Sequence, residues 1–167
     1  MTVLMNVPDD TRALRNAFAC YPSGVTAVCA IVDGVPTGMA ASSFTTVSLE
    51  PPLVSVCIQN SSTTWQRLKE AQRIGVSVLS ENQDLACVKL ASKTGDRFEG
   101  LDWSAEETGA VFIEGSTAQL DCSIYGSFDA GDHAIVLLRV HALGTTPDVQ
   151  PLVFHGSRMR RLSPIAP

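Results

Sequence analysis

One stretch of the chain, 38–52, sets small and hydroxyl-bearing residues directly before a large apolar side chain and a pair of prolines. The small residues and hydroxyls of 38–43 let a backbone come close to a ligand and offer N–H and O–H donors. One phenylalanine follows them, and Pro51-Pro52 ends the stretch with stiff geometry before the apolar run 53–58. By itself the stretch is typical either of a tight crossing between strands or of a ligand pocket beside a core strand.

Short β-branched and apolar runs recur along the chain and predict a mainly β protein with flanking helices. Strands are expected over 25–32, 53–58, 74–79, 118–125, 134–143 and 152–155, with a hairpin turn at Asp33-Gly34 leading into a further strand. Helices are expected over 9–19 and after two capping boxes, Thr63 with Gln66 and Ser80 with Gln83. The glycine-punctuated segment 92–111 is predicted to be a long loop. This pattern favours a closed barrel with helical flanks.

Size and charge limit the class of protein. The length of 167 residues predicts a single domain over 1–167, with its core at about 12–162. A net charge of −5 without a long basic run argues against nucleic-acid binding. No apolar run approaches the ~20 residues of a membrane helix, and the N-terminus lacks the basic and apolar regions of a signal peptide. Five scattered cysteines without a C-x-x-C pair favour free thiols, and we therefore expect a cytoplasmic protein.

Several enzyme classes lack their motifs in this chain. The three histidines have no H-E-x-x-H context, so no metal site is expected. The G-x-S-x-G elbow of hydrolases is absent, and so are the G-x-G-x-x-G and P-loop patterns of nucleotide-binding folds. Any nucleotide must therefore be bound without a conventional nucleotide-binding domain.

Two polar clusters are the candidates for chemistry. The segment Asn60-Ser61-Ser62-Thr63-Thr64 precedes a predicted helix, where its hydroxyls and N–H groups suit either a phosphate or the capping of that helix. The pair Asp132-His133 opens a strand. A histidine at a strand end is typical of a hydrogen-bonded structural residue or of a ligand contact, with Asp132 as the group that would orient it.

Several spaced segments carry a resemblance to a known family. They are Tyr21 to Thr26, Ala40-Ala41-Ser42-Ser43-Phe44, Val47 to Leu53, Asp96 to Trp103, Gly131-Asp132-His133 and Pro151 to Phe154. From about 18 to 162 the chain resembles the flavin reductase family with a split-barrel flavin-binding fold. The resemblance implies an FMN-binding split β-barrel of Greek-key-like topology, assembled as a homodimer with flavin near the subunit interface.

The same resemblance implies an activity and a set of site residues. The activity is that of an NAD(P)H:flavin oxidoreductase, which passes hydride from NADH or NADPH to FMN or FAD and releases reduced flavin to a partner monooxygenase. Because hydride moves directly between two stacked rings, no strong acid or base is required. The implied flavin contacts are Ala41, Ser42, Ser43, Asn60 and Ser61, with Thr37, Ser48 and Lys89 as further candidates. His133 is implied to position the nicotinamide with Asp132 behind it, and Phe98 is either a lid over the ring or a core aromatic.

Two positions depart from the family pattern, and two other functions stay open. Met159 stands where relatives carry an aromatic residue, and Ala40 stands where many carry threonine. The first change affects how the reductant would be held, and the second removes one hydroxyl from the flavin pocket. The alternatives are a flavin-loaded oxidoreductase that acts on another substrate and a non-catalytic electron carrier similar to flavoredoxin.

Overall fold

The structure, a computed structural model, describes residues 4, 6–7 and 9–163. The N-terminal residues on which the expectation of no signal peptide rests lie partly outside this range. Three helices are described: α1 (Thr11–Phe18), α2 (Thr63–Leu68) and α3 (Asp84–Ala91). The strands are β1 (Ser23–Gly24), β2 (Thr26–Val32), β3 (Val35–Ala41), β4 (Thr45–Leu49), β5 (Pro52–Gln59), β6 (Ile74–Val78), β7 (Trp103–Ala105), β8 (Val111–Ile113), β9 (Ala118–Ala130), β10 (His133–Thr145), β11 (Val153–His155) and β12 (Arg158–Arg160). The predicted mainly β class is confirmed.

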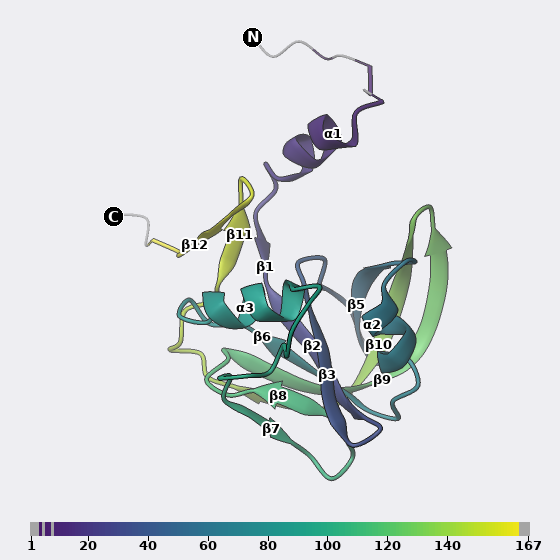
Figure 1. Ribbon diagram of the computed structural model, residues 1–167, viewed down its shortest axis with the longest axis vertical. Coiled ribbons are helices and arrows are strands. Elements are labelled where there is room, and N and C mark those ends of the chain that lie inside the picture. The colour runs from purple at the N-terminus through teal and green to yellow at the C-terminus, as the bar shows by residue number, and fades with distance from the viewer. Residues whose placement is uncertain (1–3, 5, 8, 164–167) are drawn as a thin grey trace.

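The main sheet is antiparallel, with seven strands in the order β3-β2-β6-β9-β10-β5-β4 (Figure 1). Its two edge strands, β3 and β4, are consecutive in the chain and are joined by residues 42–44 alone. A link of this length reaches at most ~14 Å. A flat sheet of seven strands would separate its edges by ~29 Å. The sheet must therefore curl until its edges come close, and the turn that joins them is the polar segment singled out in the sequence.

The side chains of β2 alternate between two hydrophobic clusters. Val28 faces a cluster that includes Trp65 of α2, whereas Cys29 faces a cluster that includes Leu90 of α3. All of these side chains are buried. Alternate residues of a strand point to opposite faces, so β2 is packed on both sides. Each of the two helices closes one of the clusters, and this fixes the positions of the loops that begin and end α2 and α3.

The first helix has no buried residue and stands apart from the main sheet in Figure 1. Its N-cap is Asp10, whose carboxylate accepts a hydrogen bond from the Arg12 N–H at 2.8 Å. A three-stranded sheet of β1, β11 and β12 lies between this helix and the body (Figure 1). The Gly156 N–H donates to the Ala19 carbonyl at 2.8 Å and ties this sheet to the end of α1. Within the described part of the chain, no helix is long and apolar enough to span a bilayer.

Both capping boxes differ from the prediction. The N-cap of α2 is Ser62 rather than Thr63, and its hydroxyl accepts from the Trp65 N–H at 3.2 Å. The side chain of Gln83 does not cap α3. Its amide oxygen instead accepts from the Ser80 N–H at 2.9 Å, so only the returning half of that box forms.

The segment 92–111 is also more ordered than predicted. It contains β7, which pairs with β8 in a separate two-stranded sheet. The rings of Phe98 and Trp103 pack edge to face, with their centroids 5.9 Å apart, and thereby hold the segment against the core. The sequence prediction also missed β4 and β12. The pairing of β4 with β5 shifts register between Thr46 and Ser48, and such an irregularity erases the alternation from which strands are predicted.

Candidate functional site

Two hollows lie side by side near the loops of α2 and α3. The first, here called the Lys93 hollow, has a volume of about 490 Å³ and is lined by Met39, Ala40, Gln59, 61–64, Leu90, Ala91, Lys93 and Arg97. The second, here called the Arg67 hollow, has a volume of about 500 Å³ and is lined by 35–38, Thr63, Thr64, Arg67 and 95–98. The two share Thr63, Thr64 and Arg97. Residues from three distant parts of the chain, 35–40, 59–67 and 90–98, therefore meet at one place.

Arg97 forms the boundary between the hollows. Its Nη1 donates to the carbonyl oxygen of Gly38 and to the hydroxyl of Thr64, each at 2.8 Å. These bonds join the 92–102 segment to β3 and α2. Gly38 also allows close packing of β3 against the core, because a Cβ there would lie 2.5 Å from the Cys29 Sγ and 2.9 Å from the Phe98 ring. The guanidinium is half-buried and held in place, which is the state in which arginine binds phosphate oxygens most specifically.

The turn that joins the sheet edges is fixed by Ser43. Its hydroxyl accepts from the Cys57 N–H at 2.9 Å and donates to the Cys57 carbonyl at 3.0 Å, so that it completes the ladder at β5. Ala41 is buried, and its carbonyl accepts from the Thr26 hydroxyl at 3.0 Å. Ser42 between them is exposed. The predicted flavin turn thus begins directly after Met39 and Ala40, which line the Lys93 hollow.

Asn60 connects the other predicted flavin turn to the histidine loop. Its side-chain amide donates to the Gly131 carbonyl at 3.3 Å, and its backbone N–H donates to the Asp132 carbonyl at 3.0 Å. The neighbouring residue Gln59 is the cross-strand partner of His133 and also lines the Lys93 hollow. The structure therefore brings together the two segments that the sequence places seventy residues apart.

His133 and Asp132 form the predicted pair. The Nδ1 atom of His133 lies 2.7 Å from the Asp132 carboxylate. This hydrogen bond, together with the charge of His133, lowers the pKa of the exposed Asp132 carboxyl. An ionised carboxylate at Nδ1 fixes the ring orientation and leaves Nε2 as the nitrogen directed at a ligand. The pair is thus arranged to orient the imidazole.

The remaining predicted residues divide between the hollows and other places. Ser61 lines the Lys93 hollow, and Thr37 and the buried Phe98 line the Arg67 hollow. Ser48 lies on the edge strand β4. Lys89 instead forms a hydrogen bond with the Glu99 carbonyl and an ion pair with its carboxylate at 3.7 Å, which direct its amine toward the loop after Phe98.

Thr63 and Thr64, which belong to the polar cluster singled out in the sequence, line the Lys93 hollow, whereas sequence reasoning did not select Gln59, Lys93 and Arg97. Lys93 and Arg97 could have been found as the pair of basic residues in the glycine-containing segment after α3. Lys93 follows the C-cap of α3, Ser92, and lines the hollow.

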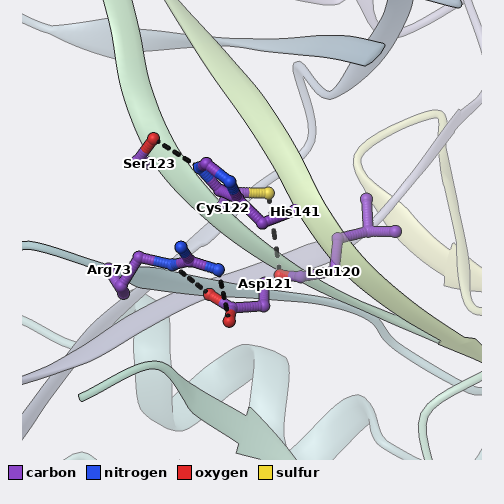
Figure 2. Close-up of polar contacts among 6 residues, drawn as sticks. All are labelled: Arg73, Leu120, Asp121, Cys122, Ser123 and His141. Carbon is purple, nitrogen blue, oxygen red and sulfur yellow. Dashed lines mark hydrogen bonds and ion pairs between the residues drawn. The ribbon is translucent and has the colours of Figure 1, made fainter. Parts of the chain in front are cut away.

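A separate polar cluster braces β9 and is shown in Figure 2. Arg73 contacts the Asp121 carboxylate with two hydrogen bonds, at 2.8 Å from Nε and 2.6 Å from Nη2. Burial raises the pKa of the adjacent Cys122 thiol to about 12. The Ser123 hydroxyl lies 2.7 Å from Nε2 of His141. The pair of Arg73 with Asp121 joins the start of β6 to β9, which is a structural role.

The chemistry of the Lys93 hollow fits a flavin nucleotide. Lys93 and Arg97 supply two cationic groups, and among the described residues no carboxylate lines this hollow. Serine and threonine hydroxyls and the Gln59 amide supply the neutral donors. Within the described ranges, no group of three or more His, Cys, Asp or Glu side chains could hold a metal ion.

Comparison with known proteins gives the same assignment. The family described as flavin reductase like domain matches residues 18–163. An NADH-dependent FAD reductase of Streptomyces globisporus is 38% identical over 164 residues, which cover 95% of this chain and 90% of that protein. The HsaB reductase subunit of a flavin-dependent monooxygenase from Mycobacterium tuberculosis is 38% identical over 147 residues, which cover 88% of this chain and 79% of that protein.

Solved structures agree with these relatives. The NADH:FAD oxidoreductase SgcE6 of Streptomyces globisporus, in complex with NAD and FAD fragments, superposes with a TM-score of 0.91 at 37% identity. The match covers 99% of this chain and 100% of that one. With a family match over most of its length, close relatives and a shared fold, the chain belongs to the flavin reductase family.

Proposed function

We propose that this protein is an NAD(P)H-dependent flavin reductase that supplies reduced FMN or FAD to a partner monooxygenase. The observation that carries the proposal is the meeting of the Lys93 hollow with the His133 loop through Gln59 and Asn60. The flavin supplies the redox chemistry, in which one hydride and one proton reduce it while NAD(P)H becomes NAD(P)⁺. The protein needs only to bind the flavin and to align the nicotinamide with it.

The proposed roles follow the geometry. Lys93 and Arg97 bind the flavin phosphate, with hydroxyl donors from Ser61 and Thr63. Ala41, Ser42 and Ser43 keep the turn beside the flavin ring, and Ser43 does so through its two bonds to β5. His133, oriented by Asp132, positions the nicotinamide from the other side.

We also propose a homodimer, which is supported by unpaired apolar surface. Phe128, Ile135 and Cys57 are cross-strand neighbours in one row over β9, β10 and β5, and all three are exposed. Cross-strand partners share one face of a sheet, so this row forms an apolar strip. A second copy of the chain would cover the strip and place the sites of the two subunits near the interface.

Three further inferences accompany the function. The curled sheet, whose edges are linked by residues 42–44, supports a split β-barrel of the family type. The family match over 18–163 supports one domain over 1–167. Finally, the name of the HsaB relative, a reductase subunit of a flavin-dependent monooxygenase, supports delivery of reduced flavin to a monooxygenase partner. The free thiols, Cys20, Cys29, Cys57, Cys87 and Cys122, support the reducing, cytoplasmic location that we propose.

The role of His133 is tested by His133→Ala and Asp132→Asn in steady-state flavin reduction. His133→Ala should raise KM for NADH and lower kcat, while the Kd for flavin changes less than about twofold. Asp132→Asn removes the charge that orients the ring but keeps its size, so it should give a smaller effect of the same kind. If both variants keep the wild-type KM and kcat, the nicotinamide role is wrong.

A further inference from the structure

The segment 92–102, here called the strap, runs along both hollows. Lys93 and Arg97 line the Lys93 hollow, and 95–98 line the Arg67 hollow. The strap therefore carries two of the side chains proposed to bind the flavin phosphate. Because a flavin held by these side chains is held by the strap, any movement of the strap bears directly on how flavin enters and leaves the site.

The backbone of the strap is weakly attached to the rest of the chain. Among the residues that the structure describes, none outside the strap forms a backbone–backbone hydrogen bond with 93–100. The bonds present there are local: the Ser92 hydroxyl donates to the Thr94 carbonyl at 2.8 Å, and Asp96 accepts from the Phe98 N–H at 2.9 Å. Phe98 is the one buried residue of 92–102. Segments with few buried side chains and few backbone hydrogen bonds open locally at a lower free energy than the core.

Side-chain contacts with β3, α2 and α3 fasten the strap. The Arg97 guanidinium donates to the carbonyl of Gly38 and to the hydroxyl of Thr64. From α3, the Lys89 amine donates to the Glu99 carbonyl and forms an ion pair with the Glu99 carboxylate at 3.7 Å. Arg97 and Thr64 line the hollows, whereas Lys89 lines neither of them. The Lys89 contact therefore holds the strap closed without touching a ligand in either hollow.

We propose that the strap opens to admit flavin and to release reduced flavin, and that Lys89 is a positioning residue that sets how often it opens. The buried Phe98 ring and the Lys89 contact favour the closed state, so the open state is a minor population. Because Lys89 fastens the strap whether or not flavin is bound, loss of its contact speeds entry and exit by the same factor and leaves the affinity unchanged. The inference rests on the proposed function and adds to it the step by which reduced flavin leaves.

The test measures the rates of FMN binding and release by stopped-flow flavin fluorescence on purified full-length protein. Lys89→Ala should raise kon and koff together, each about fivefold, as expected for one lost hydrogen bond from a partly exposed amine, and leave the Kd within about twofold. Lys89→Arg keeps a cationic donor for the Glu99 carbonyl and should restore the wild-type rates. Lys69→Ala removes the same charge at the end of α2, lines neither hollow, and should change neither rate.

A merely structural role of Lys89 gives a different result, because a loosened site releases flavin faster but does not admit it faster. A rise in koff alone in Lys89→Ala would therefore overturn the proposal. Unchanged rates would overturn it as well, since flavin would then pass without movement of the strap. Equal rates in Lys89→Ala and Lys89→Arg would overturn the role given to the donor at this position. Failure of the proposed function has its own signature, because wild type would then bind FMN without reducing it with NADH.

Discussion

Arg97 shows how one residue shapes this site. It is held by a carbonyl of β3 and a hydroxyl of α2, and so it fixes the wall between two hollows rather than protruding from one of them. Its identity as arginine matters because Nη1 alone makes both bonds, which leaves the separate donors Nε and Nη2 of the same planar group for a ligand, whereas a lysine has a single nitrogen. The site therefore depends on hydrogen bonds between residues far apart in the sequence more than on groups with strongly shifted pKa values.

Substitution of the two lysines near the end of α3 should affect the Kd for flavin differently. Lys93→Ala should raise the Kd for flavin about tenfold, because it removes a cation from a hollow without carboxylates. Lys89→Ala should leave that Kd within about twofold, because the Lys89 amine is engaged by Glu99. Flavin titration of both variants checks this, and the reverse ranking would place the phosphate at Lys89 instead.

The burial of the cysteines predicts which of them a thiol reagent labels at pH 8. Burial raises the pKa values of Cys29 and Cys122 to about 12, so their thiols stay protonated at this pH and lack the reactive thiolate. Cys20 is exposed. Mass spectrometry should therefore find label on Cys20 in the native protein, and on Cys29 and Cys122 only after unfolding. Native labelling of either buried thiol would contradict the packing described for β2 and β9.

Among the elements, the buried strands were the most predictable. The apolar runs that became β2, β5 and β6 were placed to within a few residues because most of their residues are buried. Irregular or short strands such as β4, β7 and β12 were missed, since their residues are mostly exposed and leave no periodic signal. The polar turns at 41–43 and 60–61 were identified, but the roles of Arg97 and Lys93 depend on long-range packing of the 92–111 segment, which no local pattern encodes.

The packing of β6 against β8 gives a prediction for stability. A Cβ at Gly75 would overlap the Val111 backbone, which cannot rotate away, so Gly75→Ala should lower the free energy of unfolding by about 3 kcal/mol. Gly144→Ala is the matched control on β10, because a Cβ there meets no atom within 4 Å. Denaturant unfolding compares the two. Equal stabilities would mean that β6 and β8 are not in the contact described.

The whole molecule presents surfaces that a single chain does not cover. The helix α1 has no buried residue, and the row of Phe128, Ile135 and Cys57 is exposed across three strands. Apolar faces of this kind on an independent unit usually mark an interface. The exposed row on β9, β10 and β5 is the surface that supports the proposed dimer.

The dimer is tested by sedimentation of the full-length protein. Wild type should sediment at twice the chain mass of 17.8 kDa. Phe128→Glu and Ile135→Glu should shift the protein toward the monomer, because each buries a charge if the interface forms. A matched substitution on α3, Val88→Glu, changes an exposed apolar residue outside the row and should leave the dimer intact. A monomeric wild type would contradict the assembly.

Reduction of free flavin by NADH in the absence of oxygen tests the central claim most directly. With protein at a small fraction of the FMN concentration, the loss of oxidised-flavin absorbance counts how many flavin molecules each protein molecule reduces. A diffusible-flavin reductase predicts many turnovers, until NADH or FMN is exhausted. Reduction of a single equivalent would indicate a resident flavin and a different final acceptor, and flavin binding without any reduction would leave an electron carrier in place of the enzyme proposed here.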